Sequence, residues 1–299
     1  MRRYRFIEQH LDAFPIDAIA GALGVSRSGF YAWRDRPDSA RRQRRNGLSE
    51  RVRSVFDEHH AIYGARKVAA ELVEQNIRVC RNTVAGLMRE MGLRSRAQKR
   101  RRFTVTTDSD HADPIASNTL DRDFAASRPN EKWVADITYV PIDEGGGGFA
   151  YMAAVMDLYS RRIVGWSVGD SLETSLVLDA LGMALESRRP EGGGGGLLHH
   201  SDRGCQYASG DYRRLLDRHG IECSMSRRGN CWDNATMERF MGSYKHEWVL
   251  HERHATVESV YKSTFRYIEM FYNRRRRHQA LGYVSPVEYE LIHRGTEAA

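Results

Sequence analysis

The segment EKWVADITYVPI at residues 131–142 constrains the fold more than any other part of the chain. Its β-branched and aromatic side chains alternate with other residues, and this two-residue period predicts a β-strand. The stretch at 149–170, FAYMAAVMDLYSRRIVGWSVGD, predicts two more strands joined near Leu158–Arg161. These three strands can pair as a meander.

Helices and strands alternate after this meander. The sequence predicts a helix, a strand, a helix, a strand and a further helix, in that order, at 173–188, 197–202, 209–220, 221–226 and after Asp233 or Asn234. This order is typical of an α/β domain, in which a mixed sheet carries helices on its faces. The pattern alone leaves several topologies open.

Charge divides the chain into two unlike parts. Residues 1–102 hold 23 Lys and Arg against 11 Asp and Glu, whereas residues 103–299 hold 23 against 28. Arginines cluster at 41–45 and 99–102, which favours contact with phosphates. A basic front joined to a different kind of domain indicates a nucleic-acid-binding protein, although a solubilising basic surface is the alternative.

The basic front contains a first pair of short helices at 15–34. Gly24 interrupts the helical pattern and Ser26 can cap the second helix. This arrangement is typical of a helix-turn-helix. The arginine-rich stretch at 39–53 is expected to form a connector or a helix. The apolar positions with helical spacing are Ile16, Ile19, Ala20 and Leu23.

A second helical pair is predicted at 63–75 and 81–93. Asn82 or Thr83 would cap the second helix and leave Arg81 and Arg89 on the surface. Two such modules in a basic segment indicate duplex DNA, and a helical bundle without a ligand is the alternative. The inward positions are expected to be Val68, Leu72, Val73, Val84, Leu87, Met88 and Met91.

The stretch after the second pair lacks periodicity and is expected to be a linker. Glycine runs at 145–148 and 192–196 predict flexible loops. The predicted domains are two basic helix-turn-helix-like modules, the linker, a catalytic core and a basic helical extension of that core, at 1–53, 54–97, 98–130, 131–250 and 251–299.

Composition excludes other classes of protein. The sequence has no apolar run long enough for a membrane span, and its first residues lack the features of a signal peptide, so a cytoplasmic protein is expected. None of the four cysteines forms a C-x-x-C pair, so a zinc site is not expected.

Three acids stand out by position. Asp136 lies within the first strand, where an ionised carboxylate is costly unless it is paired or bound to metal. Asp202 ends the strand LLHHSD, and Glu238 lies near the start of a helix. Mg²⁺ prefers carboxylate oxygens, and two such ions can promote phosphoryl transfer. Each acid alone can equally be a helix cap or a surface charge.

The chain resembles the second-frame transposases of insertion sequences whose enzyme is split over two overlapping reading frames, members of the DDE integrase-core superfamily. The likeness covers nearly the whole chain. It rests on YGARK at 63–67, LMREMGL at 87–93, WVADITY at 133–139, DLYSRRIVGW at 157–166, HSDRGCQY at 200–207, WDNATMERF at 232–240, KHE at 245–247 and YNRRRRHQALGYVSP at 272–286.

This resemblance implies an RNase H-like core in which Asp136, Asp202 and Glu238 bind two Mg²⁺ or Mn²⁺ ions. The 35 residues between the last two acids match the family's spacing. The resemblance gives Lys245 the role of holding DNA phosphates, leaves Asp233 as a cap and places Glu247 on the surface. Further DNA contacts are expected from Arg81, Arg89, Arg274, Arg275, Arg276 and Arg277, and support from His200, Gln206, Tyr207 and Asn234. Packing roles are expected for Trp133, Trp166 and Trp232.

The implied function is a DNA transposase that cleaves 3′ ends of an insertion sequence and transfers the strand. The expected partners are double-stranded DNA, a leading-frame protein as partner or fusion, and further copies of the chain on DNA, with no membrane and a place at the nucleoid. The glycine runs look longer than the family's usual loops. A non-catalytic DNA-binding regulator and an RNase H-like nuclease are the alternatives.

Overall fold

The structure is a computed structural model that describes residues 2–96, 114–143, 147–190 and 196–294. It divides the chain into two compact units, Met1–Val55 and Phe56–Ala299. Within the described residues, no helix is both long and apolar enough to cross a bilayer.

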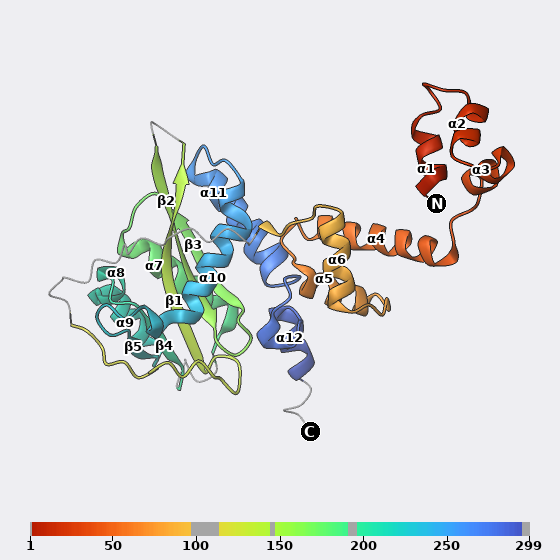
Figure 1. The fold of residues 1–299 in the computed structure, drawn as a ribbon. Helices are drawn as coiled ribbons and strands as arrows, with labels where there is room; N and C mark the ends of the chain where they lie inside the picture. The colour runs from red at the N-terminus through yellow and green to blue at the C-terminus, as the bar shows by residue number, and fades with distance from the viewer. Residues whose placement is uncertain (1, 97–113, 144–146, 191–195, 295–299) are drawn as a thin grey trace. The chain divides into compact units, whose positions relative to one another are not determined.

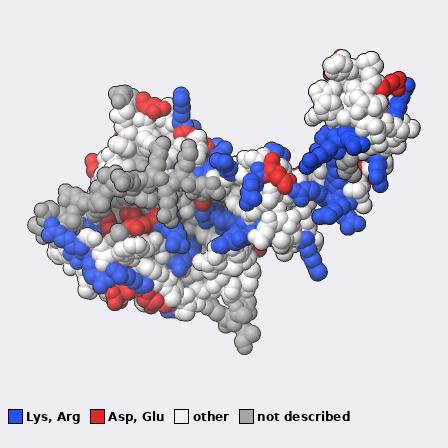
Figure 2. All heavy atoms as spheres, viewed as in Figure 1, with Lys and Arg blue, Asp and Glu red and all other residues white. Residues whose placement is uncertain are grey.

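The first unit is helical. It contains α1 (Arg2–Gln9), α2 (Ile16–Ala22) and α3 (Arg27–Arg34). The predicted cap is confirmed, because the Ser26 hydroxyl accepts a hydrogen bond of 3.0 Å from the Gly29 N–H group. The arginine-rich stretch forms a helix, α4 (Ala40–Glu58), and its arginines gather along its surface in Figure 2. The core of the three short helices consists of Ile7, Ile19, Ala20 and Phe30.

The second unit begins with the other predicted helical pair, α5 (Ala65–Glu74) and α6 (Arg81–Glu90). Arg81 and Arg89 are exposed, as predicted. Two details of the prediction are wrong. Val73 faces solvent, and the residue at the N-cap of α6 is Cys80, which makes no side-chain capping bond. The buried side chains of the pair include Val68, Leu72, Val84, Leu87 and Met88.

A five-stranded mixed sheet follows, with strand order β3-β2-β1-β4-β5 (Figure 1). The first three strands form the predicted antiparallel meander, and β4 and β5 add to β1 in parallel. The α/β prediction is therefore confirmed. The strands are β1 (Lys132–Ile142), β2 (Gly148–Asp157), β3 (Ile163–Gly169), β4 (Leu198–Ser201) and β5 (Glu222–Met225).

One face of the sheet packs against α7 (Thr174–Arg188), α8 (Cys205–Ala208) and α9 (Gly210–Arg218). Their buried side chains share a core cluster with Trp133 and Ala135 of β1. The approach of α7 to β3 is close at Gly165, where a Cβ atom would lie 2.1 Å from the Ala180 carbonyl oxygen. Since side chains alternate along a strand, Asp136 belongs to the opposite face.

The helix α10 (Ala235–Ser243) contacts β1, and the C-terminal helices continue from it. Two of these segments are π-helical, which places them among the features enriched at functional sites. The 3₁₀ turn η4 (Cys231–Asn234) directly precedes α10. The C-terminal helices after α10 are η5 (Tyr244–Trp248), η6 (Val249–His251), α11 (Val257–Phe265), η7 (Arg266–Tyr272), η8 (Gln279–Leu281) and α12 (Pro286–His293). The two π-helical segments are η5 and η7.

The described part of the expected linker, residues 114–130, has no helix or strand but packs against the core. Leu120 is buried, and the N–H groups of Thr119 and Leu120 donate to the Ser224 hydroxyl of β5. Residues 98–113, residues 145–146 of the first predicted glycine loop and residues 192–195 of the second lie outside the described residues.

Candidate active site

Asp136 and Asp202 come from neighbouring parallel strands. The register pairs Val134 with His200, and two more steps along both strands bring Asp136 level with Asp202, which directly follows β4. Residues paired in a parallel register point to the same side of a sheet. Both carboxylates therefore belong to the face of the sheet that α10 crosses.

Glu238 reaches this face from α10. At the start of that helix, the Asn234 side-chain amide donates a hydrogen bond of 2.9 Å to the carbonyl oxygen of Ala135, the residue before Asp136. Glu238 follows Asn234 by four residues, which is close to one helical turn, so both project from the same side of the helix. The hydrogen bond from the Asn234 side chain therefore holds the start of α10 against β1, where Glu238 approaches the two aspartates.

The charges around Asp136 act on its pKa. Burial raises the pKa of Asp136 well above its usual value, and the negative charges of Asp202 and Glu238 raise it further. The positive charge of Lys245, which lies in η5, acts in the opposite direction. The pKa of Lys245 is itself lowered by burial, and Asp136 offsets part of that effect. Burial also raises the pKa of Glu238.

Each aspartate has a local backbone partner. The Asp136 carboxylate accepts a 2.8 Å hydrogen bond from the Ile137 N–H group, and that of Asp202 accepts one of 3.0 Å from Gly204. In this conformation, the described residues contain no group of three or more His, Cys, Asp or Glu side chains arranged to hold a metal ion. The three acids share one face of the sheet without closing around a common point.

The four residues expected to give support lie around this face. His200 is buried between the hydroxyls of Ser224 and Ser226, and burial lowers its pKa to about 4, so it packs beneath the site as a neutral side chain. Gln206 donates to the Leu172 carbonyl oxygen at 2.8 Å.

Among these four residues, Tyr207 is the one whose pKa responds to the charges of both aspartates. It is buried, its hydroxyl has no hydrogen-bond partner among the described residues, and the charges of Asp136 and Asp202 contribute to the rise of its pKa. An unpaired buried hydroxyl next to two carboxylates can donate to either of them. Asn234, the fourth residue, also has an unpaired carbonyl oxygen.

Asp233 does not cap α10, contrary to the prediction. Its buried carboxylate accepts hydrogen bonds from the guanidinium groups of Arg227 and Arg122 and from the Asn118 amide. The Arg227 bonds hold the pKa of Asp233 well below its usual range. This cluster ties the described part of the linker region to the turn before α10.

The surface position predicted for Glu247 is wrong, because its side chain is buried. Its two oxygens accept hydrogen bonds of 2.6 Å each from the Arg276 guanidinium. Arg277 pairs with Glu71 and Glu74 of α5. The expected phosphate contact does not fit Arg276, which is buried, whereas Arg274 and Arg275 are exposed and keep that role as a prediction.

The three tryptophans differ in environment. Trp133 and Trp166 are buried, as predicted. The packing role expected for Trp232 is wrong, because 68% of its surface is exposed on the turn that leads into α10. Lys67 was not predicted to have a role. The apolar face formed by its neighbour Val68 and by Leu72 indicates that Lys67 lies at the edge of a core.

Fold and site together define a protein of the integrase-core class that carries a helix-turn-helix-like module. The sequence models described as "Integrase core domain" match residues 126–231 and 219–286, and the one described as "HTH-like domain" matches residues 43–102. The chain belongs to the family of transposases encoded by IS3-type insertion sequences.

Two relatives establish this membership. Transposase InsF for insertion sequence IS3A of Escherichia coli is 40% identical over 291 residues, covering 96% of this chain and 98% of that protein. The insertion element IS600 uncharacterized 31 kDa protein of Shigella sonnei is 42% identical over 267 residues, covering 89% of this chain and 95% of that protein.

Solved structures with a similar fold include the HTLV-2 integrase catalytic core domain in complex with magnesium. The match covers 54% of this chain and 97% of the integrase chain, with 14% sequence identity and a TM-score of 0.40.

Proposed function

We propose that Asp136, Asp202 and Glu238 are the catalytic acids of a DNA transposase and hold two divalent cations, Mg²⁺ or Mn²⁺. The observation that supports this assignment is the placement of Asp136 and Asp202 at the same level of neighbouring parallel strands, on the face that Glu238 approaches from α10. Three carboxylates with one nearby lysine leave an excess of negative charge. Hard cations with oxygen ligands match that donor set.

Two bound ions would activate the attacking oxygen and stabilise the leaving oxygen. The protein's own contribution is positional. Asp136 and Asp202 present their oxygens from a rigid sheet, and Glu238 approaches from α10.

Lys245 is the residue we propose to hold the DNA phosphate at this site. Its ammonium group lies near Asp136 and is partly buried, so an incoming phosphate would meet a positive charge in a medium that screens it weakly. A water molecule then attacks the phosphodiester at an element end and releases a 3′-hydroxyl. That hydroxyl attacks a second phosphodiester in line, forms a new P–O bond and displaces the 3′ oxygen of the attacked strand, which takes up the proton, so that the strand is transferred.

The substrates under this proposal are the double-stranded ends of the element and target DNA. Cutting and joining require two ends together, so the chain is expected to act as an oligomer on DNA and with a leading-frame protein as partner or fusion. The exposed Arg81, Arg89, Arg274 and Arg275 are proposed DNA contacts. The domain boundaries given above are proposed as the functional division of the chain.

The test is cleavage of a labelled element-end duplex in Mg²⁺, with and without the leading-frame protein. Asp136→Asn, Asp202→Asn and Glu238→Gln keep the shape of each side chain and remove its charge, so cleavage should fall to background. Duplex binding in Ca²⁺ should persist. Glu258→Gln is the matched control, since Glu258 pairs with Lys262 on the exposed side of α11. Normal cleavage by any one of the three variants would remove that residue from the catalytic set.

A further inference from the structure

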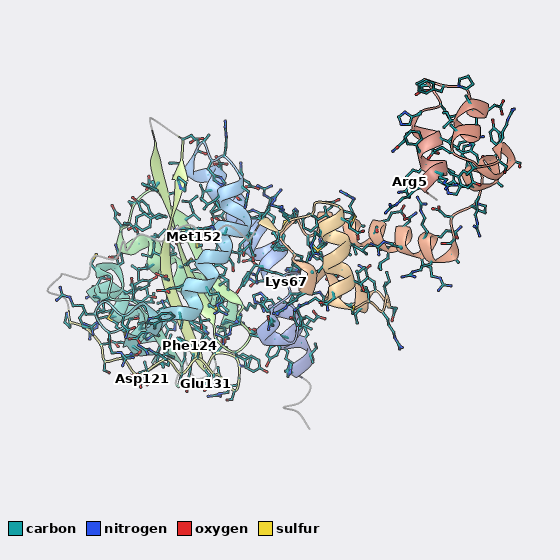
Figure 3. The ribbon with its side chains drawn as sticks, in the orientation of Figure 1. Arg5, Lys67, Asp121, Phe124, Glu131 and Met152 are labelled. Carbon is teal, nitrogen blue, oxygen red and sulfur yellow. The ribbon has the colours of Figure 1, made fainter. Side chains whose placement is uncertain are left out.

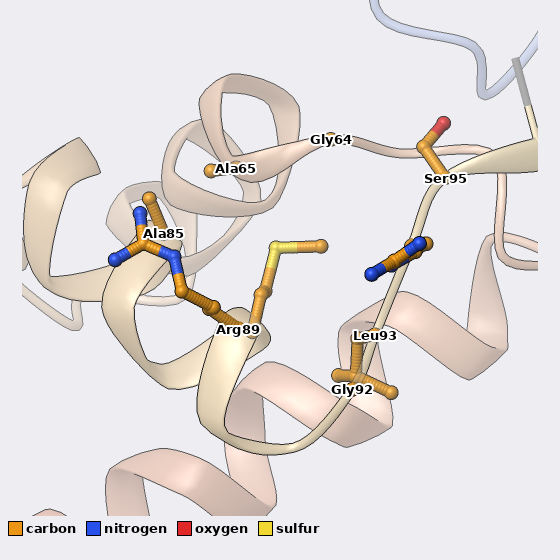
Figure 4. Close-up of a pocket in the computed structure, with 9 residues that line it drawn as sticks. Gly64, Ala65, Ala85, Arg89, Gly92, Leu93 and Ser95 are labelled. Carbon is orange, nitrogen blue, oxygen red and sulfur yellow. The ribbon is translucent and has the colours of Figure 1, made fainter. Parts of the chain in front are cut away.

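A groove at the start of α5 is lined by cations, of which only Arg81 and Arg89 are among the DNA contacts proposed above. It consists of two adjoining hollows of about 460 Å³ each, which share Gly64, Ala65, Ala85 and Ser95. Figure 4 shows the residues that line one of the two. Four of the residues that line it are arginines, and a fifth cation is Lys67. The arginines are Arg66, Arg81, Arg89 and Arg94.

One wall of the groove is a single face of α6. Arg81, Ala85 and Arg89 are spaced by four residues, so they align along the helix. The alanine between the two arginines leaves room at the middle of the wall. Both arginines are exposed, and neither forms an ion pair with any residue in the part of the chain that the structure describes.

Lys67 projects from α5 and is labelled in Figure 3. Its ammonium nitrogen lies 5.1 Å from the centre of the Tyr63 ring and forms no hydrogen bond or ion pair within the described ranges. Burial and the neighbouring charge of Arg276 lower the pKa of Lys67 to about 7, and the negative charge of Glu247 offsets part of this effect. A mostly buried ammonium group that forms no ion pair is costly, so an anionic ligand would stabilise it.

Glu247 also lines the groove, but its charge is already neutralised. Arg276 occupies both of its oxygens at 2.6 Å, and the Tyr267 hydroxyl adds a bond of 3.3 Å. The pair contributes no net charge to the groove. Lys67 and the arginines therefore set its potential as positive.

The backbone at the start of α5 adds further donors. Gly64 is the N-cap and offers no side chain, and the N–H groups of Ala65 and Arg66 have no acceptor among the residues with described positions. Free N–H groups at a helix start favour anions. No atom lies within 4 Å of where a Cβ of Gly64 would be, so a ligand can approach this backbone.

We propose that the groove formed by Lys67, Arg66, Arg81 and the start of α5 binds a backbone phosphate of the DNA that this transposase acts on. The proposal rests on the DNA substrate of the proposed function. It assigns the site to the sugar–phosphate backbone rather than to base edges, because the donors are cations and N–H groups spread along a shallow surface. Lys67 positions the DNA and takes no part in the chemistry.

The test measures binding of an element-end duplex to the full chain in Ca²⁺, over a series of salt concentrations. Lys67→Met should weaken binding to specific and unrelated duplexes alike, and should reduce the slope of log K against log salt by about 0.9, the value for one phosphate contact. Lys67→Arg should retain most of the affinity. Lys262→Met, which removes an exposed lysine paired with Glu258, should leave both quantities unchanged.

The stability of the Lys67→Met variant distinguishes a role of Lys67 in binding phosphate from a role in stabilising the fold. Without DNA, Lys67→Met should be at least as stable as the unmodified chain, because relief of the buried charge outweighs loss of the contact with the Tyr63 ring. In addition, inorganic phosphate should raise the thermal midpoint of the unmodified chain more than that of Lys67→Met. Marked destabilisation of Lys67→Met with an unchanged salt slope would overturn the proposal, as would a response confined to inorganic phosphate.

The outcome is independent of the catalytic acids. Lys67→Met should still cleave DNA at saturating duplex concentration, so its defect lies in binding. If Asp136→Asn cleaves normally while Lys67→Met shows the smaller salt slope, the acid assignment fails and the phosphate groove stands. If Lys67→Met binds with normal affinity and slope, the groove fails whatever the acids do.

Discussion

Removal of Arg276 tests whether the arginine run near the C-terminus is structural or binds DNA. Arg276 is 9% exposed and Glu247 5% exposed, and two hydrogen bonds of 2.6 Å join them. Arg276→Met would leave the Glu247 carboxylate buried with only the Tyr267 hydroxyl as a close partner. Breaking a buried pair in this way costs about 3–5 kcal/mol of the free energy of unfolding.

Thermal unfolding provides the assay. For a unit of this size, a loss of about 3–5 kcal/mol lowers the unfolding midpoint by about 6–20 °C. Arg274→Met is the matched control, since Arg274 is exposed two residues away and its loss should change stability by no more than about 0.5 kcal/mol. The transition to follow is that of residues 56–299, which form one compact unit.

A double-mutant cycle identifies the partner. Glu247→Gln alone should also destabilise the chain, because it leaves the Arg276 charge buried. The combined variant should lose less stability than the sum of the two single losses, since neither charge remains. The reasoning is refuted if Arg276→Met unfolds within about 0.5 kcal/mol of the unmodified chain while its DNA binding falls. That result would return Arg276 to the phosphate contacts.

Two further predictions concern packing and pH. Gly165→Ala in β3 should lower the free energy of unfolding by about 1–3 kcal/mol or more, because the new methyl group would meet α7. Gly182→Ala in α7 meets no atom within 4 Å and should raise the free energy of unfolding by about 0.5–1 kcal/mol, and chemical denaturation of both variants checks this pair. The low pKa of Asp233 in the folded chain means that its contribution to stability is present above its unfolded value and is lost as pH falls through the folded one. Asp233→Asn should therefore lower the unfolding midpoint at neutral pH, and the difference should shrink in acid; a constant difference down to low pH would contradict the ion-pair assignment.

Periodicity in the sequence predicted most of the elements. The alternation in 131–142 and the helical spacing in 173–188 depend only on neighbours along the chain, and the structure confirms both elements as β1 and α7. The cap at Ser26 is local in the same sense. These features follow from short-range physics, which a single sequence displays directly.

The roles of Asp233 and Glu247 could not be predicted in this way. Asp233 meets Arg122, which lies 111 residues earlier, and Glu247 meets Arg276, which lies 29 residues later. An acid near a helix start has the same local pattern whether it caps the helix or pairs with a distant arginine. Only the folded chain decides between the two.

The candidate site was partly accessible from sequence. The resemblance supplied the three acids, and the register of β1 with β4 supplies the physical reason that two of them are neighbours. The groove beside Lys67 had no comparable signal. Its lining residues come from α5, α6 and the C-terminal segments, and their proximity depends on tertiary packing.

The anomalous scattering of Mn²⁺ in crystals of the full chain bound to element-end DNA tests the central assignment most directly. We expect manganese between the carboxylates of Asp136 and Asp202, and a second ion about 3.5–4 Å away within reach of Glu238. Manganese ordered on the DNA or elsewhere on the protein, with these three carboxylates free of metal, would contradict it.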